Sequence, residues 1–397
     1  MIEPFRIPLA PPDYPFTGPS PYSIQFAFFF RQPQPAQAIS DALQQTLAQF
    51  YPVKGQLVLE ENCFYLQPGA SIRLEVIEHE ECLPRVSLPS GLANFYQEVK
   101  AEVHAPLAQF CLHQYPDGSL LVANIAHCLV DGYSFFYFMS AWARDCRGEA
   151  YRLPCHDRAR LIPDSIDDQA PQEETAFDQQ FTQQTGLSVH QERQFPGIHE
   201  IVWEENRISA EQLDHLKARC LPDQPSDNAV LCAHLWKQYG QIWQGGEAPE
   251  TRLSLSCALD FRRIYRKVIP PNYFGNAIKG TRCQLPLDHV RTLSLRDLAM
   301  QIQSSILGQR PGDIDQHLLA LHTFRDRYGV KRMPCLHVSN PETGLLITNL
   351  SRIPLKDLDF GLGAPFAMVP LVSAARVGVI LPSDGGLTVM MAHPLSS

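Results

Sequence analysis

Hydrophobic residues in the first part of the chain alternate between strand spacing and helix spacing. Residues 22–30 form a run rich in aromatic and apolar side chains, which predicts a strand. After Pro35, apolar residues recur at positions 39, 43, 47 and 50, as on one face of a helix. Pro52 predicts the end of that helix, and two short strands are expected at residues 56–59 and 63–66.

A hairpin is predicted farther along the same half. Residues 110–114 and 120–126 are strand-like and flank the turn sequence Pro116-Asp117-Gly118. An apolar, aromatic-rich helix is expected over residues 135–142. Because strands and helices follow one another through the first 156 residues, the pattern predicts a mixed α/β (α+β) domain.

Residues 157–200 differ in character, being polar, acidic and rich in glutamine. Such a segment buries little surface, so we predict a crossover linker between two domains. Structure is expected to resume at residue 201, and Ser209 with Gln212 predicts a capping box at the start of a helix. A chain of 397 residues is too long for a single hydrophobic core, so two domains are expected. The predicted organisation is a first domain over residues 1–156, a linker over 157–200 and a second domain over 201–397.

Charge and composition narrow the class of function. The net charge of −9 provides no excess of cations to neutralise phosphates, so no nucleic-acid partner is expected. The Pro-rich start of the chain lacks the pattern of a signal peptide. The densest apolar run, residues 24–30, is too short to span a bilayer. We therefore expect a cytoplasmic monomer without a membrane partner.

The cysteines argue against a metal site. Eleven cysteines are scattered singly, with no Cys-x-x-Cys and no tight Cys/His cluster. An odd number without these spacings predicts reduced thiols and no bound metal.

The stretch most informative about chemistry is residues 125–132, which reads Ile-Ala-His-Cys-Leu-Val-Asp-Gly. The pattern places His127 where a buried strand gives way to a loop. An imidazole with an ordinary pKa near ~6.5 accepts a proton at neutral pH, as a general base must. Asp131 precedes a predicted helix, where the free amides and the dipole favour a carboxylate. Taken alone, this short motif leaves open whether His127 is a base or a buried structural histidine.

Other segments, in matching order, resemble the BAHD acyltransferases. The first motif of that family is His-x-x-x-Asp-Gly, and its second, Asp-Phe-Gly-Trp-Gly, is similar to the segment from Asp359 to Gly363. Further segments that resemble the family are residues 47–55, 124–127, 141–143, 233–236, 260–263 and 270–276. The resemblance covers nearly the whole chain apart from the glutamine-rich linker.

What the resemblance implies is a pair of chloramphenicol-acetyltransferase-like domains, with mixed sheets flanked by helices and a tunnel between them. Acyl-CoA, a co-substrate, enters one mouth, and a small-molecule alcohol or amine enters the other. His127 takes the acceptor proton, and the oxygen or nitrogen then attacks the thioester. The implied reaction needs no metal, no permanently bound cofactor and no covalent intermediate.

The resemblance also implies supporting roles for other residues. Asp131 pairs with Arg262 and points away from the tunnel, while Gly132 permits a tight turn. The motif residues Asp359, Gly361 and Gly363 are structural. Leu362 stands in place of the family tryptophan, at an expected packing position.

A second tryptophan of the family is also absent. Residues 347–352 resemble a family segment reading Thr-Ser-Trp, in which the indole N–H helps to hold the oxyanion. Leu350 stands in its place and cannot donate a hydrogen bond. Thr348 shares a strand face with Leu350 and is the candidate oxyanion donor, whereas Asn349 is expected to point into the domain.

Several other residues have two interpretations. Arg263, Lys267 and Lys279 belong to a basic run that either meets the phosphates of coenzyme A or forms solvated surface. Cys128 is expected to point to the opposite face from His127. His234 is expected to pack along its own helix.

Two alternative functions remain open. One is a condensation-type enzyme that takes its acyl group from a carrier protein, although Ala126 stands where such enzymes have a first histidine. The other is a non-catalytic relative that binds a ligand, which Leu350 would allow. Intact His127, Asp131 and Arg262 argue against the second.

Overall fold

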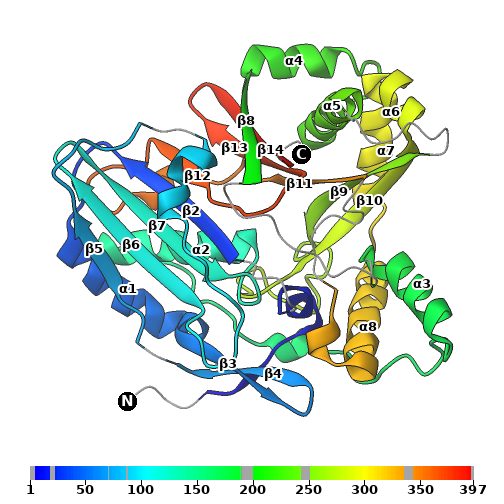
Figure 1. Ribbon diagram of the computed structural model, residues 1–397, viewed down its shortest axis with the longest axis horizontal. Coiled ribbons are helices and arrows are strands. Elements are labelled where there is room, and N and C mark those ends of the chain that lie inside the picture. The colour runs from blue at the N-terminus through cyan, green and yellow to red at the C-terminus, as the bar shows by residue number, and fades with distance from the viewer. Residues whose placement is uncertain are drawn as a thin grey trace.

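The structure is a computed structural model, and it describes residues 5–17, 23–69, 71–85, 88–187, 189, 200–242, 251–334 and 343–394. Within these ranges the strands form three sheets, two large and one small, in a mixed α/β arrangement (Figure 1). The small sheet has the order β1-β4-β3 and is built from β1 (Ile7–Pro8), β3 (Gly55–Glu60) and β4 (Cys63–Pro68).

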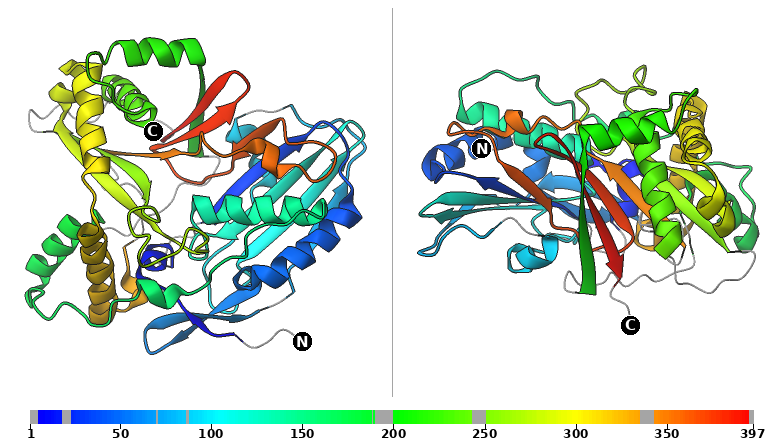
Figure 2. Two further views of the ribbon diagram at one scale, coloured as in Figure 1. Left: turned by 180° about the vertical axis from the view of Figure 1, so that it is seen from behind. Right: turned by 90° about the horizontal axis from the view of Figure 1, so that it is seen from above.

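The first large sheet belongs mostly to the N-terminal half and has the order β12-β2-β7-β6-β5. The predicted hairpin is present, with Tyr115 opposite Gly118. Helices α1 and α2 lie side by side over one face of this sheet (Figure 2). The elements are β2 (Ser23–Phe30), α1 (Ala36–Gln49), β5 (Leu74–Glu78), β6 (Ala108–Tyr115), β7 (Gly118–Ala126), α2 (Gly132–Cys146) and β12 (Ala367–Pro370).

The second large sheet has the order β10-β9-β11-β13-β14-β8. It is mixed, because β11 runs parallel to both of its neighbours and the other pairs are antiparallel. Its strands are β8 (Ile201–Ser209), β9 (Arg252–Asp260), β10 (Ile278–Pro286), β11 (Gly344–Asn349), β13 (Val377–Ser383) and β14 (Gly386–Pro394). The helices of this half are α4 (Ala210–Ala218), α5 (Asp227–Ile242), α6 (Leu287–Thr292), α7 (Leu295–Leu307) and α8 (Pro311–Tyr328).

Strand alternation divides this sheet between a core and a cavity. On β9, Leu255 and Cys257 pack with Trp236 of α5 in a buried cluster, whereas Ser256 and Ala258 face a cavity on the other side. Successive side chains of a strand point to opposite faces, so one strand can serve both. The predicted capping box is also present, since Ser209 and Gln212 exchange two hydrogen bonds of 2.8 and 3.1 Å at the start of α4.

The glutamine-rich linker contains a helix that its composition did not predict. Helix α3 (Glu174–Thr185) packs against α8. Phe177 and Phe181 lie one turn apart on α3, and both bury their rings against Phe324, with centroids 6.2 and 4.5 Å away. Two aromatic side chains on one helix face are enough to anchor an otherwise polar helix, so this part of the linker buries more surface than expected.

The C-terminal half also contributes to the first sheet. Strand β12 pairs antiparallel with β2, with Val369 opposite Ala27. The segment before it, η7 (Leu355–Leu358), contacts α2. Residues 355–358 and 367–370 therefore lie against the N-terminal half in space, although they fall within residues 201–397, the predicted second domain.

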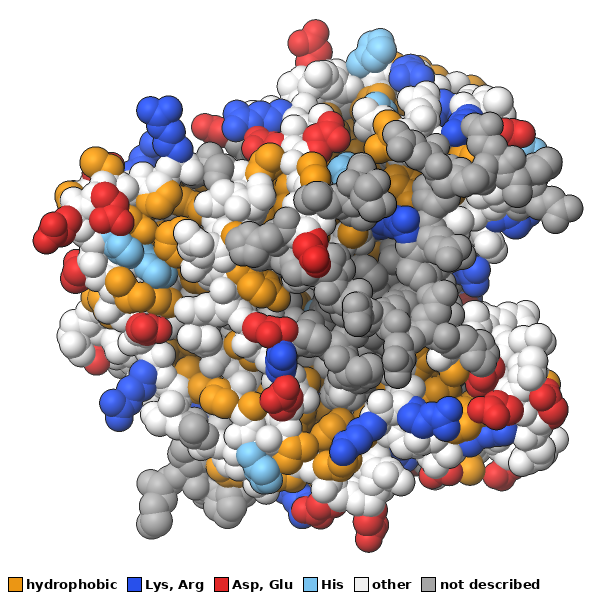
Figure 3. Space-filling view, viewed as in Figure 1, with side chains coloured by type: hydrophobic (Ala, Val, Ile, Leu, Met, Phe, Trp, Pro, Cys, Tyr) orange, Lys and Arg blue, Asp and Glu red, His pale blue; other side chains and the backbone are white. Residues whose placement is uncertain are grey.

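The surface carries charges of both signs. On the face shown in Figure 3, acidic and basic side chains are interspersed among polar and apolar ones. No helix in the described ranges combines the length and the apolar character needed to cross a bilayer.

Candidate active site

A cavity of about 700 Å³ lies between the two large sheets. The N-terminal half contributes residues of β2 and α2 to its wall, among them Phe26 and Phe136. The C-terminal half contributes residues of β9, β10, β11 and β13. Because the lining combines apolar side chains with polar and charged ones, the cavity suits an organic ligand held by specific contacts.

His127 lies in the wall of this cavity, in the loop between β7 and α2. Its side chain is largely buried, with the residue 8% exposed. The imidazole stacks on Phe16 with ring centroids 3.7 Å apart and planes 7° from parallel. The backbone carbonyl of His127 accepts a hydrogen bond of 2.7 Å from Nδ2 of Asn276. The ring therefore faces the cavity with both its orientation and its peptide held by neighbours.

Burial lowers the pKa of His127 to about 4, partly opposed by the Asp131 carboxylate and the Asn276 side chain. The imidazole is consequently neutral at pH 7 and has a lone pair for an incoming proton. The low pKa also means that the protonated ring, once formed, gives its proton up readily.

Buried histidines of this kind predict loss of stability in acid. Burial lowers the pKa of His127, and likewise those of His113, His156 and His322, to about 4, and the pKa of His317 to about 3. In the unfolded chain these rings take up protons below about pH 6.5. The unfolded state therefore binds more protons between pH 6.5 and 4, so the free energy of unfolding falls as the pH drops through that window.

The check is thermal unfolding measured from pH 7 to pH 5, where Tm should fall. His317 is 3% exposed and lies on α8, away from the cavity wall, so His317→Asn should make the fall shallower. If Tm fell equally steeply with pH in wild type and in His317→Asn, His317 would not contribute to the loss of stability in acid.

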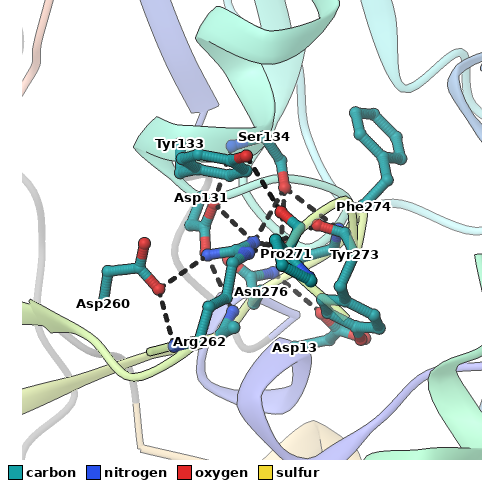
Figure 4. Close-up of polar contacts among 12 residues, drawn as sticks. Asp13, Asp131, Tyr133, Ser134, Asp260, Arg262, Pro271, Tyr273, Phe274 and Asn276 are labelled. Carbon is teal, nitrogen blue, oxygen red and sulfur yellow. Dashed lines mark hydrogen bonds and ion pairs between the residues drawn. The ribbon is translucent and has the colours of Figure 1, made fainter. Parts of the chain in front are cut away.

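The structure contains the ion pair between Asp131 and Arg262 (Figure 4). Nη1 of Arg262 lies 2.8 Å from Oδ2 of Asp131, and Nη2 lies 3.1 Å from Oδ1. Asp131 also caps α2, because its Oδ1 accepts from the Ser134 amide at 2.8 Å. Its Oδ2 accepts from the Ala277 amide at 2.8 Å. With both oxygens occupied, the carboxylate joins the two halves and does not line the cavity.

Arg262 is held by more than Asp131. Its guanidinium also donates to Asp260 at 3.1 Å, to Oγ of Ser134 at 3.0 Å and to the Gly275 carbonyl at 2.8 Å. Burial by itself would lower the pKa of Arg262, but the carboxylates of Asp131 and Asp260 outweigh it and raise the pKa. A permanently charged, fully bonded guanidinium of this kind acts as a structural bridge.

Leu346 and Thr348 of β11, and Leu350 directly after the strand, line the cavity. A methyl carbon of Leu350 would lie only 3.4 Å from a Cβ placed on Gly132, so Leu350 contacts the start of α2 just after the His127 loop. Asn349 also borders the cavity, but both ends of its side-chain amide are hydrogen-bonded. Its Nδ2 donates to Oδ1 of Asn228 at 2.8 Å, and its Oδ1 accepts from the Ser351 backbone amide at 2.9 Å. Thr348 is thus the side chain of this segment that offers a hydroxyl to the cavity.

The motif from Asp359 to Gly363 forms a loop on the C-terminal end of α2. Oδ1 of Asp359 accepts from the amides of Gly361 and Gly363 at 2.7 and 2.8 Å, and both glycines have φ above +100°, which favours glycine. Phe360 is buried against Trp142, with ring centroids 5.2 Å apart. None of the five residues lines the cavity. The expectation that Leu362 packs is wrong, because it is 45% exposed at the tip of the loop.

The basic residues singled out from the sequence are separated in space. Arg263 is exposed and lines the cavity. Lys279 also lines it but is buried, and its ammonium donates to the Asp313 carbonyl at 3.3 Å. Lys267 is exposed and does not border the cavity. Two cations that the sequence did not single out, Arg282 and Arg352, do border it.

The remaining candidates lie outside the cavity wall. Cys128 packs in the main apolar core, and burial raises the pKa of its thiol, so it is not a nucleophile at neutral pH. His234 on α5 is likewise not part of the wall. In the described ranges, no group of three His, Cys, Asp or Glu side chains is arranged to hold a metal ion.

Three residues around His127 were not singled out as site residues, although Asn276 lies in the segment 270–276 that resembles the family. Asp13 and Arg158 form a fully buried ion pair with Nε to Oδ2 at 2.9 Å, and Asn276 links Asp13 to His127. Asp13 lies in a Pro-rich segment and Arg158 in the predicted linker. Neither position has a local pattern that distinguishes a buried charge from a solvated one.

Comparison of the chain with known proteins identifies its family. The profile described as "Transferase family" matches residues 6–397. Hydroxycinnamoyltransferase 2 of Oryza sativa subsp. japonica is 26% identical, over 92% of this chain and 88% of its own. Shikimate O-hydroxycinnamoyltransferase of Nicotiana tabacum is 24% identical, over 90% of this chain and 84% of its own.

Solved structures agree on the fold. The F. graminearum TRI101 structure complexed with coenzyme A and T-2 mycotoxin superposes with a TM-score of 0.76 at 14% identity, over 98% of this chain and 95% of that one. The predicted chloramphenicol-acetyltransferase-like fold is therefore confirmed. With its profile matched from end to end and its two halves enclosing a histidine-bearing cavity, the chain belongs to the BAHD acyltransferases of the Transferase family.

Proposed function

We propose that the protein transfers an acyl group from acyl-CoA to a hydroxyl or amine of a small molecule, with His127 as the general base. The observation that carries this proposal is the neutral, ring-stacked imidazole of His127 in the wall of the cavity between the halves. A base in such a position can meet an acceptor from one side and a thioester from the other.

In the proposed reaction, His127 removes the proton from the acceptor as its oxygen or nitrogen attacks the thioester carbonyl. The tetrahedral intermediate then collapses and expels the coenzyme A thiolate, which takes the proton from the imidazolium. The low pKa of His127 favours this second transfer, because the buried imidazolium is a stronger acid than an exposed one. The acyl group passes directly between the substrates, so no covalent acyl-enzyme forms.

Two observations support acyl-CoA as the acyl donor: the names of the relatives and the cationic side chains at the cavity. Relatives in the family are named for hydroxycinnamoyl transfer, and the TRI101 structure contains coenzyme A. Arg263, Arg282 and Arg352 border the cavity here and offer cationic contacts for phosphates. Lys279 stays in the proposal as a buried contact, whereas Lys267, which lies off the cavity, has no part in it.

We propose Thr348 as a donor to the oxyanion. Removing one donor from a developing oxyanion slows the chemical step by about 10²–10³-fold. Thr348→Val keeps the shape and loses the hydroxyl, so the single-turnover rate should fall while acyl-CoA affinity stays nearly constant. Asn349→Ala is the matched control, because its lost bonds to Asn228 and Ser351 should lower stability rather than the rate. An unchanged rate for Thr348→Val would mean that other groups hold the oxyanion.

Incubation with a panel of acyl-CoAs and alcohol or amine acceptors, followed by thiol release, tests the function. Thiol release that needs both an acceptor and His127 supports the proposal. Turnover only with a carrier-protein-bound donor would favour the condensation-type alternative. Saturable ligand binding with no turnover from either donor would favour the non-catalytic alternative.

A further inference from the structure

A short helical segment near the N-terminus, η1 (Pro11–Phe16), lies directly behind the His127 loop. All six of its residues are buried. The Ala10 amide donates to Oδ2 of Asp13 at 2.9 Å, which caps the segment internally. An aspartate is rarely fully buried unless its charge is paired. The partner of Asp13 therefore identifies the part of the chain that η1 packs against.

That partner is Arg158, which comes from the linker between the two halves. Its Nε donates to Oδ2 of Asp13 at 2.9 Å, and both side chains are 0% exposed. Its two other nitrogens donate to the Leu129 carbonyl at 2.7 Å and to the Phe274 carbonyl at 3.1 Å. Leu129 lies two residues after His127. The guanidinium therefore holds the His127 loop from behind.

Asn276 holds the other side of the same loop. Its Nδ2 donates to Oδ1 of Asp13 at 2.8 Å (Figure 4) and to the His127 carbonyl at 2.7 Å. The carbonyls of His127 and Leu129 are thus both bonded to groups that are themselves bonded to Asp13. Neither group belongs to the His-x-x-x-Asp-Gly motif.

The same segment also contacts the ring of His127. Phe16 lies three residues after Asp13 and stacks face to face on the imidazole at 3.7 Å. Phe16 is 1% exposed and lines the cavity. Its face covers one side of the imidazole.

We infer that η1 is a positioning element of the active site. Asp13, through Arg158 and Asn276, sets the position of the His127 peptide, and Phe16 sets the plane of its ring. This inference rests on the proposed role of His127 as a base. It differs from the Asp131–Arg262 pair, which holds the start of α2 after the loop.

The first test replaces Phe16 with leucine, which keeps an apolar side chain and removes the stack. Phe181→Leu is the matched control, because Phe181 is also buried, at 2% exposed, but packs between α3 and α8. We expect kcat to fall about 10–10²-fold in Phe16→Leu with the KM for acyl-CoA within about twofold. Phe16→Tyr, which keeps the ring, should restore most of kcat. Equal kcat in Phe16→Leu and Phe181→Leu would overturn the role of Phe16.

The second test removes both charges of the buried pair. Asp13→Asn or Arg158→Met alone leaves one buried charge without its partner and is expected to unfold the protein at lower temperature. The double variant, Asp13→Asn with Arg158→Met, removes that penalty and should recover much of the lost Tm. It still lacks the donor to the Leu129 carbonyl, so kcat should stay at least about tenfold below wild type. A double variant that recovers Tm and kcat together would show that the pair serves stability alone.

A third readout does not depend on turnover. Histidine labelled with ¹³C gives an NMR signal for His127, assigned by its loss in His127→Gln. In wild type this signal should stay that of a neutral ring from pH 8 to pH 5. In Phe16→Leu, water reaches the ring and the signal should begin to titrate in that range, but not in Phe181→Leu. An identical titration in all three proteins would overturn the inference, whereas absence of turnover in wild type would instead overturn the proposed function.

Discussion

Replacing His127 with alanine is expected to lower turnover about 10²–10⁴-fold, the range by which a positioned general base accelerates proton transfer. The neutral acceptor would then have to attack without losing its proton, and no other histidine borders the cavity among the described residues. The ring of His127 packs on Phe16 but carries none of the bonds of the Asp131–Arg262 pair. The fold should therefore survive the change.

The measurement is single-turnover acyl transfer, with folding checked by circular dichroism and thermal unfolding. His234→Ala is the control, because His234 lies on α5 outside the cavity wall and should leave turnover unchanged. If a well-folded His127→Ala protein kept at least about a third of wild-type turnover, another group would have to accept the proton.

Removing Asp131 is expected to damage stability as much as activity. Asp131→Ala leaves the guanidinium of Arg262, which is 4% exposed, without its principal carboxylate and leaves the Ser134 and Ala277 amides without acceptors. Breaking a buried pair from one side costs about 3–5 kcal/mol of unfolding free energy. The start of α2 would also lose its cap, which displaces the loop that carries His127.

A double-mutant cycle of Asp131→Ala and Arg262→Ala, followed by urea unfolding, measures the pair directly. The combined loss should be well below the sum of the single losses, because the double variant contains no unpaired charge from this pair. Asp260 also contacts Arg262, but its side chain is 40% exposed. Asp260→Ala should accordingly cost much less, since an exposed partner is screened by solvent. Additive losses for Asp131 and Arg262 would contradict the coupling.

The correct predictions share a physical basis. The hairpin around Pro116-Asp117-Gly118 and the box of Ser209 with Gln212 depend on neighbours in the chain, so local pattern was sufficient. The linker helix α3 was missed because its surface is mostly polar and its two anchoring rings need α8 to be recognised as buried. Leu362 was expected at a packing position from the family resemblance, but in the loop between Gly361 and Gly363 it is 45% exposed.

The amino-acid order alone specifies which residue types are present for the chemistry and where they stand along the chain. The segment with His127, Asp131 and Gly132, the strand with Thr348 and Leu350, and the segment with Arg262 could all be read from it. It also determined the alternation that turns Thr348 and Leu350 to one face, because side-chain direction along a strand has a period of two.

The surroundings of His127, in contrast, depend on how the folded chain brings distant segments together. Asp13, Arg158 and Asn276 come from three distant parts of the chain. Asp13 and Arg158 are ordinary charged residues in their local context, and only Asn276 lies in a segment that resembles the family. They become a buried network because folding removes them from water together, and a charge without solvent must find its partner inside the protein. The same desolvation lowers the pKa of His127 to about 4, which no local pattern could predict because it depends on every atom packed around the ring.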